Sequence, residues 1–155
     1  MVKYMNWKVE KGTIADAGTI AGFQVDMALE SEGTVLDADT IAKGVSAGLS
    51  DPVKGTYYLV KTEDGETAGS LFLTKEWSDW NNCWYWWVQS VYIRPEYRRK
   101  GAFTFLYGTV RRFAVDDGAA NLRLYVDRNN TNAQECYRKQ GMDECHYLMY
   151  EEPIK

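Results

Sequence analysis

The spacing of apolar and polar residues over the first fifty positions predicts a short strand followed by two helices. The strand-like run covers residues 6–10. Thr13 and Asp16 form a capping-box pattern before a run of helical periodicity that ends by Gly33. Asp37 can cap a second helix, which we expect to be short because two glycines lie within it.

Alternating β-rich segments in the middle of the chain predict three strands. Residues 57–61 and 67–74 flank an Asp-Gly turn within residues 63–66, which predicts an antiparallel hairpin. A polar and aromatic stretch, residues 76–82, is expected to be a loop. The long β-rich run 84–93 is typical of a central strand, and a proline shortly after it stops the strand.

The last third of the chain alternates between helix and strand signals. Residues 101–115 carry an apolar stripe at helical spacing, and residues 122–126 form a β-rich run. Asn130 or Thr131 can cap a short helix that Gly141 closes, and residues 146–150 are expected to form the final strand. No repeat or linker divides this pattern, so we expect an α/β fold.

Length and composition favour one soluble domain over residues 1–155. A chain of 155 residues, 45% hydrophobic and 26% charged, can bury a continuous core without disulfide or metal support. It contains no apolar run of the about 20 residues that cross a bilayer and no signal-peptide core, so we expect a cytoplasmic protein with no membrane partner. The three cysteines are widely spaced without a CxxC pair, which indicates neither a disulfide framework nor a metal site.

Positive charge is concentrated in one segment of an acidic chain. The formal net charge is -4, yet residues 94–112 contain six basic residues and one acid. A protein that binds duplex nucleic acid normally spreads positive charge over a whole face, so we expect no nucleic-acid partner. A patch of this size suits a small polyanion, such as the phosphates of a cofactor.

The strongest chemical signal is a β-rich run that ends in Arg-Pro-Glu-Tyr-Arg-Arg-Lys-Gly-Ala, residues 94–102, and passes directly into an amphipathic helix. The backbone N–H groups and the positive dipole end at a helix N-terminus attract anions. Arg98, Arg99 and Lys100 can screen a pyrophosphate there, and Gly101 lets the backbone approach it. A solvated charge run is the alternative interpretation. The chain contains neither a P-loop nor a GxGxxG fingerprint.

The order of residues 91–102 resembles the acetyl-CoA-binding motif of the GNAT N-acetyltransferase superfamily, whose core is Gln/Arg-x-x-Gly-x-Gly/Ala. Arg98 and Gly101 match this core, whereas Phe103 stands where the family has a small residue. A ring at that position favours altered cofactor binding and limited room for longer acyl chains.

A second segment lies about 30 residues downstream and is also similar to the superfamily. Asn130-x-x-Ala133-x-x-x-Tyr137-x-Lys139-x-Gly141-Met142 looks like its Asn-x-x-Ala...Tyr-x-x-x-Gly-Phe pattern, with Met142 in place of the usual aromatic residue. Two motifs in the right order are more specific than either alone. The resemblance covers roughly residues 68–150.

The resemblance implies a fold, a cofactor and a set of contacts. The fold would be a mixed, mostly antiparallel sheet with splayed central strands, flanked by about four helices. The cofactor would be acetyl-CoA. Its predicted contacts are Val91, Ile93, Arg98, Arg99, Lys100, Gly101, Ala102, Phe103, Thr104, Asn130, Ala133 and Tyr137.

Acetyl transfer to an amine needs a base and an acid. A protonated alkyl amine, with a pKa near ~10.4, must lose a proton before it attacks a thioester, and the leaving thiolate gains from protonation. Tyr137 is the candidate acid, although a tyrosine taken alone is more often part of a core. Glu30, Glu76 and Asp79 are candidate bases, directly or through water, although a carboxylate of this kind taken alone is more often a surface charge than a base. No covalent acyl-enzyme is required.

The acceptor is suggested by acids interleaved with aromatic residues, which together favour a cationic ligand. The predicted acceptor contacts are Trp77, Asp79, Trp80, Trp87 and Gln89. We therefore expect a primary amine of a small molecule or a peptide. Two questions remain open at this point. The same fold could instead serve as a non-catalytic acyl-CoA sensor or interaction module, and the protein could be a monomer or a homodimer.

Overall fold

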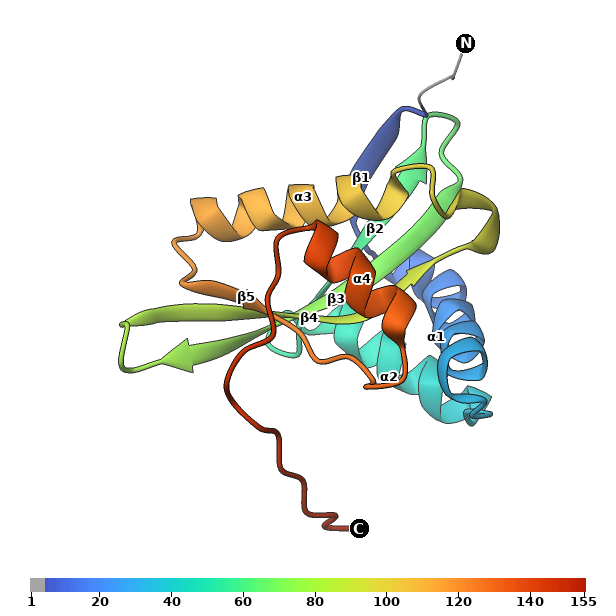
Figure 1. The fold of residues 1–155 in the computed structure, drawn as a ribbon. Helices are drawn as coiled ribbons and strands as arrows, with labels where there is room; N and C mark the ends of the chain where they lie inside the picture. Colours follow the sequence, from blue (N-terminus) through green and yellow to red (C-terminus); the bar gives the residue numbers. More distant parts are fainter. Residues whose placement is uncertain (1–4) are drawn as a thin grey trace. The chain divides into compact units, whose positions relative to one another are not determined.

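The computed structural model describes residues 5–155 and contains one five-stranded sheet. Its strands are β1 (Trp7–Lys11), β2 (Thr56–Thr62), β3 (Thr67–Ser78), β4 (Cys83–Ile93) and β5 (Asn121–Arg123). They lie in the order β1-β2-β3-β4-β5 (Figure 1). The first four strands pair antiparallel, and β5 joins β4 in parallel. The sheet is therefore mixed and mostly antiparallel, as the resemblance implied.

Residues 5–155 contain four α-helices. They are α1 (Ala17–Glu32), α2 (Ala38–Ser50), α3 (Ala102–Asp116) and α4 (Thr131–Lys139), and two short 3-10 turns cover Ile14–Asp16 and Pro95–Tyr97. The chain forms two compact units, one that ends at Tyr125 and one that runs from Val126 to Lys155. The single-domain organisation therefore stays a prediction.

Local signals set the boundaries of the first two helices. Asp16 Oδ2 accepts a hydrogen bond from the Thr13 backbone N–H at 2.8 Å, which is one arm of the predicted capping box. Asp37 caps α2 by accepting from the Thr40 backbone N–H at 2.8 Å. The expectation that this second helix is short was wrong, because α2 runs for 13 residues. Its Gly48 lets the helix approach the sheet, since a Cβ there would lie 3.2 Å from Tyr57 Cε2.

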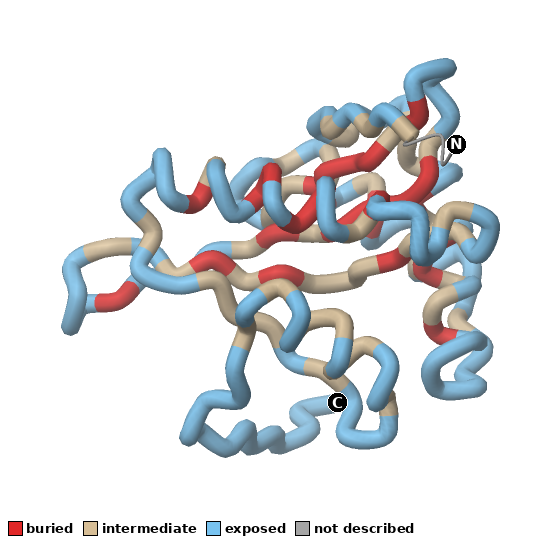
Figure 2. Tube along the Cα trace, turned by 45° about the horizontal axis from the view of Figure 1, so that its top comes forward, coloured by how far each residue is buried: buried red, intermediate tan, exposed pale blue. Residues whose placement is uncertain are grey.

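The core of the first unit lies on both faces of the sheet. On one face Leu71 and Val88 pack against Leu106 of α3, and on the other Leu59 packs against Ile20 of α1. Figure 2 shows the buried segments following the strands and the helices beside them. Full burial of a leucine or isoleucine side chain stabilises the fold by about 1.5–3 kcal/mol. The two faces therefore fix the sheet between α3 and the α1–α2 pair.

Three sequence-based boundaries were wrong. Residues 76–78 belong to β3 and not to a loop, because Trp77 pairs with Trp84 across the hairpin. The centroids of these two rings lie 5.0 Å apart. The strand expected over residues 122–126 covers only Asn121–Arg123. Residues 146–150 form no strand, because the unit that contains them holds no strand with which they could form a ladder. Within residues 5–155, no helix is long and apolar enough to cross a membrane.

Candidate functional site

Strands β4 and β5 separate after three paired positions. Tyr85, Trp86 and Trp87 of β4 pair with residues 121–123 of β5. Strand β4 then continues to Ile93, and its edge on that side has no partner strand within the described part of the chain. This separation agrees with the splayed strands that the resemblance implies. It leaves backbone hydrogen-bonding groups of β4 without ladder partners, and such groups can hold an extended ligand.

A bulge bends β4 along this unpaired edge. Ser90 has a φ of 51°, and the register with β3 shifts between Ser70 and Phe72. A β-bulge bends a strand and redirects its side chains. Beside the bulge, Gln89 donates a hydrogen bond from Nε2 to Thr74 Oγ1 at 2.5 Å. The Gln89 side chain, which is partly buried, is therefore held against β3.

The turn between β4 and α3 has the geometry of an anion site. Gly101 has a φ of 85° and directly precedes α3, and Phe105 donates the first helical bond to its carbonyl at 3.0 Å. The positive end of the α3 dipole therefore lies at this turn. Arg99 and Lys100 are exposed and form no ion pair with any residue in 5–155. Both cations can reach a bound anion.

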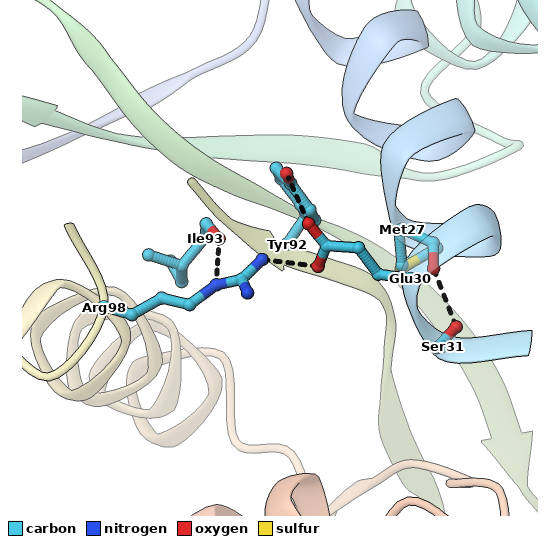
Figure 3. Close-up of polar contacts among 6 residues, drawn as sticks. All are labelled: Met27, Glu30, Ser31, Tyr92, Ile93 and Arg98. Carbon is cyan, nitrogen blue, oxygen red and sulfur yellow. Dashed lines mark hydrogen bonds and ion pairs between the residues drawn. The ribbon is translucent and has the colours of Figure 1, made fainter. Parts of the chain in front are cut away.

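Arg98 of this turn bridges β4 and α1 (Figure 3). Its Nε donates to the Ile93 carbonyl at 2.8 Å, and its Nη2 forms an ion pair of 2.7 Å with Glu30 Oε2. The guanidinium carbon lies 5.4 Å from the centre of the Tyr92 ring, and the Tyr92 hydroxyl donates to Glu30 Oε1 at 3.4 Å. A predicted phosphate contact and a predicted base are thus joined to each other. Sequence reasoning assigned no role to Tyr92, because it lies within the motif segment 91–102 but outside the motif core.

A cavity of about 350 Å³ borders Glu30 in the first unit. Its lining combines three carboxylates, two aromatic rings and one arginine with two apolar residues: Phe23, Asp26, Leu29, Glu30, Tyr92, Arg94, Pro95 and Glu96. Arg94 pairs with Glu96 at 2.5 Å, so one acid of the lining is neutralised. Burial chiefly raises the pKa of Tyr92, helped by the negative charge of Glu30. The hydroxyl is therefore protonated at neutral pH, as its hydrogen bond to Glu30 requires.

The predicted acceptor contacts are distributed along β3 and β4. Trp77, Asp79 and Trp80 lie at the tip of the β3–β4 hairpin, whereas Trp87 and Gln89 lie further along β4. The structure therefore does not bring the hairpin residues together with the turn at Arg98.

Two of the three candidate bases, Glu30 and Glu76, are separated in the same way. Glu76 pairs across β3 and β4 with Tyr85, near the hairpin tip, and forms an ion pair of 3.3 Å with Arg123. Glu30 contacts Tyr92, near the opposite end of β4. Each carboxylate already has an arginine partner.

The second unit carries the other predicted motif. Asn130 Oδ1 accepts from the Ala133 backbone N–H at 3.1 Å and caps α4, so the capping role of Asn130 is confirmed. Gly141 has a φ of 89° and closes the helix, and the Met142 backbone N–H donates to the Tyr137 carbonyl at 3.1 Å. Burial raises the pKa of Tyr137 to about 12.

Comparison with known proteins connects this geometry to a family. The family model described as "Acetyltransferase (GNAT) family" matches residues 29–142. A possible acetyltransferase from Clostridium difficile 630 is 39% identical, with a TM-score of 0.90 over 96% of this chain and 98% of the other. None of the curated protein sequences compared with the chain matches it.

More distant structures share the fold alone. A ribosomal-protein-alanine N-acetyltransferase from Brucella melitensis biovar Abortus 2308 is 15% identical, with a TM-score of 0.78 over 97% of this chain and 100% of the other. An aminoglycoside acetyltransferase, meta-AAC0020, from an uncultured soil metagenomic sample is 14% identical, with a TM-score of 0.71 over 96% and 97%. The family match over most of the chain and the 39% identical relative carry the assignment: the chain belongs to the GNAT acetyltransferase family.

Proposed function

We propose that this chain is an acetyl-CoA-dependent N-acetyltransferase that acts on a primary amine of a small molecule or a peptide. The acetyl group would move to the amine by direct attack, without a covalent acyl-enzyme. The observation that carries the proposal is the edge of β4 that, within residues 5–155, has no partner strand beyond Trp87. This edge leads through the turn to the N-terminus of α3, where Gly101 is the N-cap. CoA joins an extended pantetheine arm to a pyrophosphate. The arm would lie along the β4 edge and the pyrophosphate would bind at the helix N-terminus.

The residues of the turn fit such a cofactor. A Cβ added at Gly101 would make ordinary van der Waals contact with Trp7 Nε1 at 3.7 Å, so the left-handed φ of 85°, and not crowding, favours glycine at this position. Arg99 and Lys100 supply exposed positive charge beside it. We assign the pyrophosphate to residues 98–104 and the pantetheine arm to the backbone of Val91 and Ile93. The Ile93 carbonyl already accepts a hydrogen bond from Arg98, so we assign the ligand contact at Ile93 to its backbone N–H.

Acetyl-CoA, when bound, supplies an acetyl group as a thioester. Tyr137 would act as the general acid, since its pKa of about 12 keeps the hydroxyl protonated at neutral pH. Asn130 and Ala133 of the same segment would contact the cofactor. Glu30 is the stronger candidate base because it lines a cavity, and a water between it and the amine could relay the proton. Glu76 remains the second candidate base.

The acceptor class follows from the cavity beside Glu30. Its carboxylates and the rings of Phe23 and Tyr92 suit a cation, through charge and cation–π contact. Trp87 and Gln89 on β4, with Trp77, Asp79 and Trp80 at the hairpin tip, would extend the acceptor surface. The relatives named above act on an aminoglycoside and on a ribosomal protein, so both small amines and peptide amines belong in the screen.

The test is a calorimetric titration of the purified protein with acetyl-CoA, followed by an acetylation assay on a panel of small and peptide amines. Binding and transfer to at least one amine class support the proposal. Binding without any transfer supports the non-catalytic acyl-CoA sensor, which Phe103 in place of a small motif residue favours. Absence of binding overturns both functions.

A further inference from the structure

The turn between β4 and α3 is held by side chains from three other parts of the first unit. Arg98 pairs with Glu30 of α1, as described above. The Tyr97 hydroxyl donates to Glu66, which lies in the β2–β3 connection. The third contact comes from Trp7 of β1 and is the only one of the three that binds a peptide group next to Gly101.

The Trp7 contact combines a hydrogen bond with ring packing. Its Nε1 donates to the Lys100 carbonyl at 3.1 Å, although the two residues are 93 positions apart in the sequence. Its ring meets the Tyr97 ring edge-on, with centroids 5.8 Å apart and planes at 87°. The indole is therefore fixed on one side by Tyr97 and directs its only donor at the turn.

This hydrogen bond determines the orientation of the neighbouring N–H group. In a trans peptide unit the C=O and the N–H point in opposite directions within one plane. When Trp7 holds the Lys100 carbonyl toward β1, the Gly101 N–H must point away from β1. Glycine tolerates many backbone conformations, so Gly101 alone would leave this peptide free to rotate.

We propose that Trp7 is a positioning residue that orients the Lys100–Gly101 peptide for a pyrophosphate. The inference rests on the proposed binding of CoA at this turn. If the peptide is already held in the binding orientation, binding does not carry the entropic cost of ordering it. The affinity for the ligand is then higher. Trp7 need not touch the ligand to act in this way.

A purely structural role is the competing explanation, because Trp7 also packs against the core on the α3 side of the sheet. Trp7→Phe separates the two roles, since it keeps an aromatic ring and removes the donor. The matched control is Trp84→Phe. Trp84 also packs edge-on against a ring, that of Trp77, with centroids 5.0 Å apart and planes at 75°.

The affinities of each protein for CoA and for pantetheine, which lacks the pyrophosphate, are measured by protein-observed NMR titration. Loss of one hydrogen bond to a carbonyl predicts about five-fold weaker CoA binding by Trp7→Phe. Pantetheine affinity should stay unchanged, and Trp84→Phe should bind both ligands as the unaltered protein does. In the unaltered protein, CoA should shift the Gly101 amide signal and pantetheine should not.

Each outcome decides the inference. If the unaltered protein fails to bind CoA, both the proposed function and the role of Trp7 are overturned. If it binds CoA and Trp7→Phe binds equally well, or loses CoA and pantetheine to the same extent, only the role of Trp7 is overturned. If Trp7→Phe does not fold, the Gly101 amide signal of the unaltered protein provides the test. A Gly101 signal that does not shift when CoA binds would refute the proposal.

Discussion

Arg98 and Glu30, 68 positions apart in the sequence, form an ion pair of 2.7 Å between α1 and the turn that joins β4 to α3. The sequence suggested a separate role for each, phosphate binding for Arg98 and proton transfer for Glu30. Their side chains are each about two-fifths exposed, so the pair itself stabilises the fold by less than about 1 kcal/mol. A change at either residue nevertheless alters the surroundings of the other.

Arg98→Ala should weaken CoA binding by about ten-fold or more, because a charge-assisted hydrogen bond contributes about 1.5–3 kcal/mol. The substitution also releases the Ile93 carbonyl, which Arg98 now holds. Calorimetric titration with CoA measures the effect. Arg98→Lys is the matched variant and should recover only part of the affinity, since one ammonium cannot reproduce the forked geometry of a guanidinium. Unaltered binding by Arg98→Ala would refute the phosphate assignment.

Glu30→Gln should lower kcat by about 100-fold or more if Glu30 is the general base, because general base catalysis contributes roughly 10²–10⁴-fold. Glu76→Gln is the matched control, since that carboxylate also has an arginine partner, Arg123, but lies near the hairpin tip. Steady-state rates on an accepted amine separate the two variants. A large loss in Glu76→Gln alone would move the base to Glu76, and full rates in both would exclude both carboxylates.

Much of the fold could be predicted because its signals are local. Asp37 and Asn130 cap the helices that the sequence assigned to them, and Gly33 ends α1 with a φ of 63°. Strand β4 and helix α3 were predicted to within one residue at each end. These elements depend on neighbours within a few positions, which a sequence displays directly.

The errors concern interactions between distant segments. Residues 146–150 have strand composition, but a strand also needs a partner, which composition does not specify. The Glu30–Arg98 pair and the Trp7 contact with Lys100 are equally non-local. The motif therefore directed attention to the turn between β4 and α3, whereas the side chains that hold this turn became visible only in the structure.

Tyr137→Phe should lower kcat by about 100-fold and leave CoA affinity nearly unchanged, because the substitution removes the proton donor and keeps the ring. The kcat is taken from steady-state rates at saturating acetyl-CoA, and the affinity from calorimetry. A variant with unchanged kcat would remove Tyr137 from the acid role. A variant that loses affinity and keeps kcat would make it a binding residue instead.

The pKa of Tyr137 predicts how activity and stability respond to alkaline pH. Burial raises this pKa from about 10 in the unfolded chain to about 12, so Tyr137 stays protonated below about pH 11 and cannot cause an alkaline loss of kcat there. Between about pH 10 and 12 the folded state binds more protons than the unfolded state. The free energy of unfolding should therefore decrease as pH rises through this window, while below it the stabilising contribution is complete.

Urea unfolding between pH 9 and 11, compared for the unaltered protein and Tyr137→Phe, measures this contribution. The alkaline decrease should be smaller in the variant, which has no phenol to ionise. Equal slopes for the two proteins would contradict a raised pKa at Tyr137.

Gly101→Ala should destabilise the protein and weaken CoA binding, because a left-handed φ of 85° costs a residue with a Cβ about 1–2 kcal/mol. For a chain of this size the melting temperature should fall by about 3–6 °C. Gly108→Ala is the matched control and should have the opposite sign. Gly108 lies inside α3 and a Cβ there meets no neighbouring atom, so alanine should stabilise the helix by about 1 kcal/mol.

Thermal unfolding and CoA titration of both variants test the pair of predictions. The Gly101 variant should lose affinity because strain at this position moves the peptide that enters α3. The Gly108 variant should bind CoA as the unaltered protein does, since its new methyl group lies on the exposed side of the helix. If Gly101→Ala kept both its melting temperature and its affinity, the left-handed turn would not be a requirement of the site.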